Sequence, residues 1–227
     1  MNDNHPARRS LMVGLGAAIA AFTLGSRSAK AQTAGRNFQP ARHDRDEWLN
    51  AVPGMHRTII DCAAVGAAGA GVLYANNLYV ANKSGYSLPE SDVAVVVCLR
   101  HFATVFAFND AIWGKYGRAM SDAVQFTDPK SKQAPSTNLL SSASYGQSMS
   151  NLGITIQSVV QRGTQFAVCD MATHMISGQV AAAAKAKPDE IYKEFVDNLI
   201  PNSHLVAAGV VAVNRAQEYG YTLLTAI

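Results

Sequence analysis

The sequence lacks a cysteine framework. Its three cysteines, Cys62, Cys98 and Cys169, are an odd number, lie far apart and form no CxxC or CxxCH motif. A disulfide scaffold, a zinc ribbon and a c-type haem site are therefore not expected. The six histidines show no HExxH spacing, and no nucleophile elbow occurs, so nothing indicates a hydrolase or a zinc enzyme. No metal and no cofactor is assigned from the sequence.

The chain also lacks an apolar run long enough to cross a bilayer. Arg8-Arg9 precedes a mild apolar stretch, Leu11 to Leu24, and then the small-x-small site Ala29-Lys30-Ala31. This order predicts a twin-arginine type signal over residues 1–31, with cleavage before Gln32. An ordinary secretory signal is the alternative. Either one predicts a periplasmic protein without a stable membrane anchor after cleavage.

Residues 32–227, which remain after removal of the predicted signal, have no net charge. The chain has 19 Lys and Arg against 16 Asp and Glu, but residues 1–31 hold four of the basic residues and one acid. The other residues are therefore balanced at 15 of each sign. The basic character belongs to the signal, so it gives no reason to expect nucleic acid as a partner.

Residues 32–56 are polar, contain Pro40 and Pro53, and are interpreted as an extended leader. From residue 57 to 227, apolar runs alternate with segments of helical spacing, which predicts one α/β domain with a mostly parallel sheet of about five strands between two helical layers. The expected strands are 57–62, 93–99, 165–169, 204–208 and 221–225. The expected helices are 65–83, 102–116, 150–161, 171–186, 188–199 and 210–219.

Two segments are less regular. The helix expected over 102–116 places Asn109 on its apolar stripe, where a buried amide needs hydrogen-bond partners. Residues 118–150 break the periodicity and are interpreted as an insertion with at most a short helix. Such a long loop is either a lid or oligomer contact, or simply a solvated excursion.

Ligands of parallel sheets bind beyond the carboxyl ends of the strands. The residues at those ends include Arg100, His101 and Cys169, which we predict to share one site. Cys169 has the strongest case for a functional thiol because a helix begins directly after it, and a helix N-terminus and nearby cations favour the nucleophilic thiolate. Arg100 and His101 are the expected cations. The other residues at this edge are Asp61, Cys62, Asp170 and Gly209.

Structural roles compete with these chemical ones. Cys98 lies inside an apolar strand and is expected to act as a small core residue, whereas Cys62 stays open between the two roles. Arg100 and His101 could instead cap a helix or pair with Asp110. His174 follows Asp170 by four residues, which favours a local pair. The glycines at 66, 69 and 71 do not match the dinucleotide fingerprint and are expected to let a helix pack closely on the sheet.

The C-terminal third resembles the DsrE/DsrF-like family. The similarity is carried by the cysteine-bearing strand–helix junction at 163–173 and by the closing pattern at 198–221, with support from 93–116. The resemblance covers roughly residues 57–227 and implies a compact α/β/α domain that assembles as trimers or hexamers. It also implies a cysteine that carries sulfur as a persulfide, and that role falls on Cys169.

Three hypotheses follow. The first is an exported sulfur-carrier or thiol-redox protein with Cys169 as nucleophile, Arg100 or His101 stabilising its thiolate, and a small sulfur compound as donor or acceptor. The second is a non-enzymatic, oligomeric periplasmic protein that binds a small ligand or a metal at the same edge. The third, a nucleotide-dependent oxidoreductase, rests on fold analogy alone.

Overall fold

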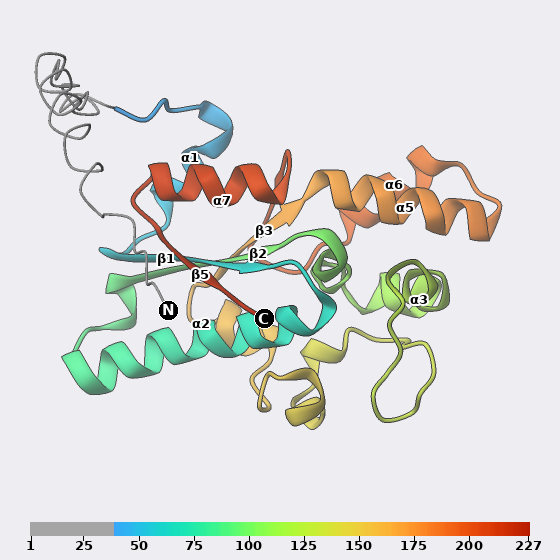
Figure 1. Cartoon of the computed structure of the whole chain (residues 1–227), viewed down its shortest axis with the longest axis horizontal. Helices are drawn as coiled ribbons and strands as arrows, with labels where there is room; N and C mark the ends of the chain where they lie inside the picture. Colours follow the sequence, from blue (N-terminus) through green and yellow to red (C-terminus); the bar gives the residue numbers. More distant parts are fainter. Residues whose placement is uncertain (1–38) are drawn as a thin grey trace, which may run out of the picture. The chain divides into compact units, whose positions relative to one another are not determined.

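Five parallel strands form one sheet in the computed structural model, which describes residues 39–227 (Figure 1). The strand order is β4-β3-β2-β1-β5. The strands are β1 (His56–Cys62), β2 (Val93–Leu99), β3 (Gln165–Cys169), β4 (Ser203–Val206) and β5 (Thr222–Thr225). The proposed signal, 1–31, and the first residues of the polar leader, 32–38, lie outside the described residues.

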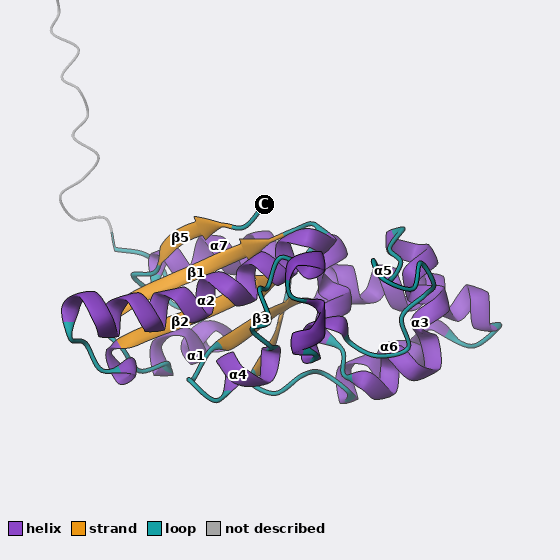
Figure 2. Ribbon diagram, turned by 90° about the horizontal axis from the view of Figure 1, so that it is seen from below, coloured by secondary structure: helices purple, strands orange, loops and turns teal. Residues whose placement is uncertain are grey.

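Helices cover both faces of this sheet, which confirms the three-layer α/β/α fold (Figure 2). They are α1 (Glu47–Ala51), α2 (Val65–Tyr86), α3 (Asp110–Val124), α4 (Ile156–Val160), α5 (Asp170–Ala184), α6 (Pro188–Asp197) and α7 (Gly209–Glu218). Six short 3₁₀ turns join them: η1 (Asp44–Asp46), η2 (Glu90–Asp92), η3 (His101–Ala107), η4 (Leu139–Ser141), η5 (Ala143–Tyr145) and η6 (Gln147–Met149). None of the helices described is long and apolar enough for a bilayer span.

The two faces of the sheet have separate cores because successive side chains of a strand point to opposite sides. Cys98 and Ala167 are level with each other and face α1 and α7. Leu99 and Val168 are the next level pair and face α2 and η3. All seven residues of β2 are buried, as expected for a central parallel strand covered on both sides.

The segment before β1 is folded against the sheet rather than extended. Residues 44–51 form η1 and α1, and Leu49 is 1% exposed. Arg57 of β1 donates to the backbone oxygens of Leu49 (2.8 Å) and Val52 (2.7 Å). Tyr221 Oη also donates to Leu49 O, at 2.8 Å. Long-range hydrogen bonds therefore make this part of the predicted leader an integral layer of the domain.

The continuous helix predicted over 102–116 is wrong. Residues 101–107 form the 3₁₀ turn η3, and the α-helix begins only at Asp110. Asn109 is the N-cap of α3, and its Oδ1 accepts from Ala111 N at 3.0 Å. Its amide also donates to Asn198 Oδ1 at 3.2 Å. The polar partners expected for Asn109 therefore exist. Its side chain caps the start of α3 and contacts Asn198, the residue at the end of α6.

The predicted insertion, 118–150, contributes to the core. Helix α3 continues to Val124, and the following turns bury Leu139, Leu140 and Met149 against the main cluster. Asn138 donates to the backbone oxygens of Phe106 and Phe108, both at 2.9 Å. The segment is therefore anchored in the core at several points, while other parts of it, such as residues 130–133, are exposed to solvent.

Candidate functional site

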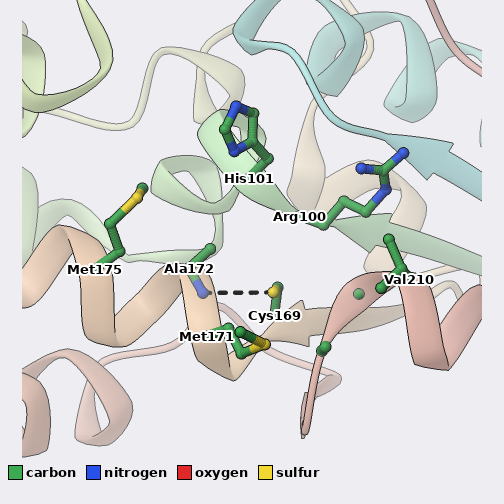
Figure 3. A pocket seen from close by; sticks show the side chains of 9 residues that line it. Arg100, His101, Cys169, Met171, Ala172, Met175 and Val210 are labelled. Carbon is green, nitrogen blue, oxygen red and sulfur yellow. Dashed lines mark hydrogen bonds between the residues drawn. The ribbon is translucent and has the colours of Figure 1, made fainter.

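A pocket of about 390 Å³ opens at the carboxyl edge of the sheet (Figure 3). It lies where β2 and β3 end and where α5 and α7 begin. The lining residues are Arg100, His101, Cys169, Met171, Ala172, Met175, Ala208, Gly209 and Val210. Four residues predicted for this edge, Arg100, His101, Cys169 and Gly209, are thus brought together. Cys62 and Asp170 are not part of the lining.

Cys169 joins β3 to α5 and is the N-cap of that helix. Its Sγ accepts a hydrogen bond from Ala172 N at 3.4 Å, the interaction drawn in Figure 3. The residue is 6% exposed, and this small opening faces the pocket. The sulfur therefore lies at the N-terminus of a 15-residue helix, where the helix dipole has its positive end. The sequence predicted this position because an apolar strand stops where the helical pattern starts.

Arg100 follows the last residue of β2. The pair Leu99 and Val168 is level, so the next residues, Arg100 and Cys169, are neighbours on the same face of the sheet. The guanidinium, however, donates to both oxygens of Asp61, at 2.6 and 2.8 Å. This bidentate hydrogen bond raises the pKa of Arg100. Its partner is Asp61 rather than Asp110, the partner considered from the sequence.

Gly209 explains how Arg100 fits beside α7. A Cβ atom at position 209 would overlap the Cβ of Arg100 and lie 2.9 Å from its Cδ. Glycine at the start of α7 therefore leaves room for the aliphatic part of Arg100. The arrangement holds the Arg100–Asp61 pair over the ends of β1 and β2.

His101 is exposed and has φ = 51°, in the left-handed region that non-glycine residues seldom occupy. Its ring stacks on Phe102, with centroids 4.0 Å apart. Figure 3 shows it on the wall across from Cys169 and α5. Neither His101 nor Arg100 makes a hydrogen bond to Cys169, so the polar contact of its sulfur is the one with the N-terminus of α5.

The other two thiols are core residues. Burial raises the pKa of Cys62, and the nearby Asp61 carboxylate adds to the increase. Burial likewise raises the pKa of Cys98, whose Sγ donates to Gly209 O at 3.6 Å. Cys62 also lies on the opposite face from Cys169, two strands away. Two strand spacings of about 4.8 Å exceed the reach of a disulfide, so Cys62 is no resolving thiol for Cys169.

Two methionines of the pocket were not predicted as site residues. Met171 and Met175 are 68% and 36% exposed and lie one helical turn apart on α5. The sequence does show that they are four residues apart and that the first of them directly follows Asp170. The predicted local pair of His174 and Asp170 exists at 3.7 Å. It is extended by Tyr192, whose hydroxyl donates to Asp170 at 2.7 Å and whose ring stacks on His174.

Compared with known proteins, the chain matches no family model and no curated sequence. The chemistry of the pocket therefore has to be inferred from its own residues.

Proposed function

We propose that the protein is an exported sulfur carrier that holds a sulfane sulfur on Cys169 as a persulfide. The observation that supports this most is the placement of the three thiols. Cys62 and Cys98 are sealed in the two cores, whereas Cys169 opens into a pocket and accepts a helix N-terminal N–H. Reactive cysteines of proteins lie in partly accessible positions of this kind, whereas fully buried structural cysteines are inert. The resemblance to the DsrE/DsrF-like family points to the same residue.

The loading step is a sulfur transfer without an external oxidant. The Cys169 thiolate attacks the terminal sulfur of a donor persulfide or polysulfide, and a new S–S bond forms on Cys169. The S–S bond of the donor breaks, and its remaining thiolate leaves with the electron pair. Transfer to an acceptor thiolate reverses this sequence and restores the Cys169 thiolate. The donor and the acceptor are therefore small sulfur compounds or protein thiols.

The lining of the pocket suits this chemistry. Met171, Ala172, Met175 and Val210 offer a mostly apolar surface around Cys169, and the volume of about 390 Å³ is within the range of small-ligand pockets. Sulfur chains are soft and poorly hydrated, so an apolar wall accommodates them well. The Arg100–Asp61 pair closes one side with no net charge. We therefore favour a small, weakly charged sulfur compound over a large anion.

A small-ligand binding protein is the second candidate function. Arg100 and His101 contact Asp61 and Phe102 rather than the thiol, so the same pocket could hold a ligand without sulfur transfer. In that case Cys169→Ser would keep ligand-induced stabilisation, because a ligand that binds only the folded state stabilises it regardless of thiol chemistry. Export to the periplasm and a trimeric or hexameric assembly belong to both proposals.

Intact-mass spectrometry after incubation with inorganic polysulfide tests the carrier. We expect a reductant-labile gain of one or more sulfur atoms in the unmodified protein. The gain should disappear in Cys169→Ser, where serine keeps a good N-cap for α5 and preserves the fold. Cys62→Ala is the matched control and should load normally. Loading of Cys169→Ser to the same extent would refute the proposal.

A further inference from the structure

Two thioethers lie beside the thiol in the pocket. Met171 and Met175 are large apolar side chains left 68% and 36% exposed, although most methionines of folded domains are buried. They are separated by four residues, so both lie on one face of α5. That face opens into the pocket lined by Cys169. The persulfide step uses the two methionines only as part of an apolar wall and gives their sulfur atoms no role.

The three sulfur-bearing residues lie within about two helical turns of the chain. Cys169 is the N-cap of α5, and Met171 and Met175 occupy the first two turns of that helix. Figure 3 shows all three side chains around one cavity, with His101 across from them. Methionine is unbranched and flexible, so its exposed thioether turns towards the cavity with little strain.

The carboxylate next to Cys169 in the chain, that of Asp170, does not line the pocket. The carboxylate of Asp170 accepts from Tyr192 Oη at 2.7 Å and lies next to His174, on the side of α5 that packs against α6. Within residues 39–227, no group of three His, Cys, Asp or Glu side chains could hold a metal ion. Among the side chains that line this pocket, Cys169, Met171 and Met175 carry soft sulfur atoms, and His101 adds an imidazole. Thiolate and thioether ligands select Cu(I) over harder divalent ions.

We propose that Cys169, Met171 and Met175 form a three-sulfur site for Cu(I). One thiolate balances the single positive charge of the ion, so the complex is neutral and suits a mostly apolar pocket. The Cys169 thiol releases its proton to solvent when the Cu–S bond forms. The site goes beyond sulfur transfer: it uses the same thiol but adds two ligands that the persulfide does not need.

Competition with a chromophoric Cu(I) chelator such as bicinchoninate tests the site, using the full chain, reduced and under nitrogen. We expect one Cu(I) per chain. The double variant Met171→Leu/Met175→Leu should bind at least tenfold more weakly, because leucine keeps the apolar volume but removes both thioethers. Cys169→Ser should bind more weakly still. Met55→Leu is the matched control, because Met55 is 88% exposed and lies outside the pocket, and it should bind Cu(I) normally.

Two results would overturn this site. One is a double methionine variant that binds Cu(I) as tightly as the unmodified protein, since Cys169 alone would then hold the ion. The other is Zn²⁺ binding as tight as Cu(I) binding. Polysulfide loading of the double methionine variant separates this proposal from the sulfur carrier. That variant should still form the persulfide. Loss of Cu(I) binding with retained sulfur loading therefore supports both proposals. Normal Cu(I) binding without any sulfur loading refutes only the sulfur carrier.

Discussion

Gly209 is the residue on which the geometry of the pocket depends most directly. Any side chain at this position would overlap the Cβ of Arg100, an atom that moves only with its backbone. Arg100 in turn holds Asp61 through two hydrogen bonds. A change at Gly209 is therefore expected to disturb an ion pair located at the end of a different strand.

Gly209→Ala should lower the free energy of unfolding by about 1–3 kcal/mol, the usual penalty for overpacking. Gly178→Ala is the matched control. Gly178 lies inside α5 with nothing within 4 Å of an added Cβ, so alanine should raise stability there by about 0.5–1 kcal/mol. Urea unfolding of both variants measures the contrast. Equal free energies of unfolding for the two variants would mean that Arg100 moves aside without destabilising the protein.

The residues of the site were predictable because each lies at the end of a clear strand. Arg100 and His101 follow the last residue of β2, Cys169 is the last residue of β3, and parallel strands bring such ends together. The partner of Arg100 was not predictable, since Asp61 lies 39 positions away and the choice depends on the register of β1 and β2. The position of His101 depends on a left-handed backbone that no sequence pattern indicates.

Helices and strands are predictable from the sequence where local and long-range preferences agree. The predicted bounds of β2 and β3 are those observed, because each is a continuous apolar run between polar residues. Helix α6 begins at Pro188, as the proline and the following acids predict. The helix predicted over 150–161 is only α4, Ile156–Val160. The other failures, η3 and α1, are short elements held by tertiary hydrogen bonds rather than by their own periodicity.

Helix α1 gives a direct test of that explanation. Leu49 is 1% exposed in the core between the sheet and α7, so Leu49→Ala should lower the free energy of unfolding by about 2–5 kcal/mol. Leu152, which is 61% exposed, is the control, and Leu152→Ala should change stability by less than about 0.5 kcal/mol. A negligible effect at Leu49, measured by urea unfolding, would show that residues 44–51 act as a detachable leader.

The whole molecule is expected to lose stability below neutral pH, partly through His204. Burial lowers the pKa of His204 below its ordinary 6.5. Its ring stacks on Trp48 at 4.0 Å and shares a 3.0 Å hydrogen bond with Gln165. Because the unfolded chain binds this proton more readily, stability is retained above pH 6.5 and falls as the pH drops through the lowered pKa.

Urea unfolding at about pH 7.5 and about pH 5.5 brackets the histidine range. The interval also stays above the acid range of Glu194, whose pKa is lowered by its hydrogen bond to Lys115. We expect the unmodified protein to lose stability between these values and His204→Gln to lose less. His56→Gln, at an exposed position, should behave like the unmodified protein. An identical loss in His204→Gln would assign the effect to other groups.

The sulfur-carrier function depends on the state of one thiol, Cys169, in the protein as the cell makes it. The most direct measurement is the intact mass of the protein isolated from the cells that produce it, before and after a reductant, with Cys169→Ser beside it. The sulfur-carrier account predicts extra sulfur that the reductant removes and that the variant never carries. A Cys169 thiol that stays unmodified, even after exposure to polysulfide, would contradict it and favour the ligand-binding function.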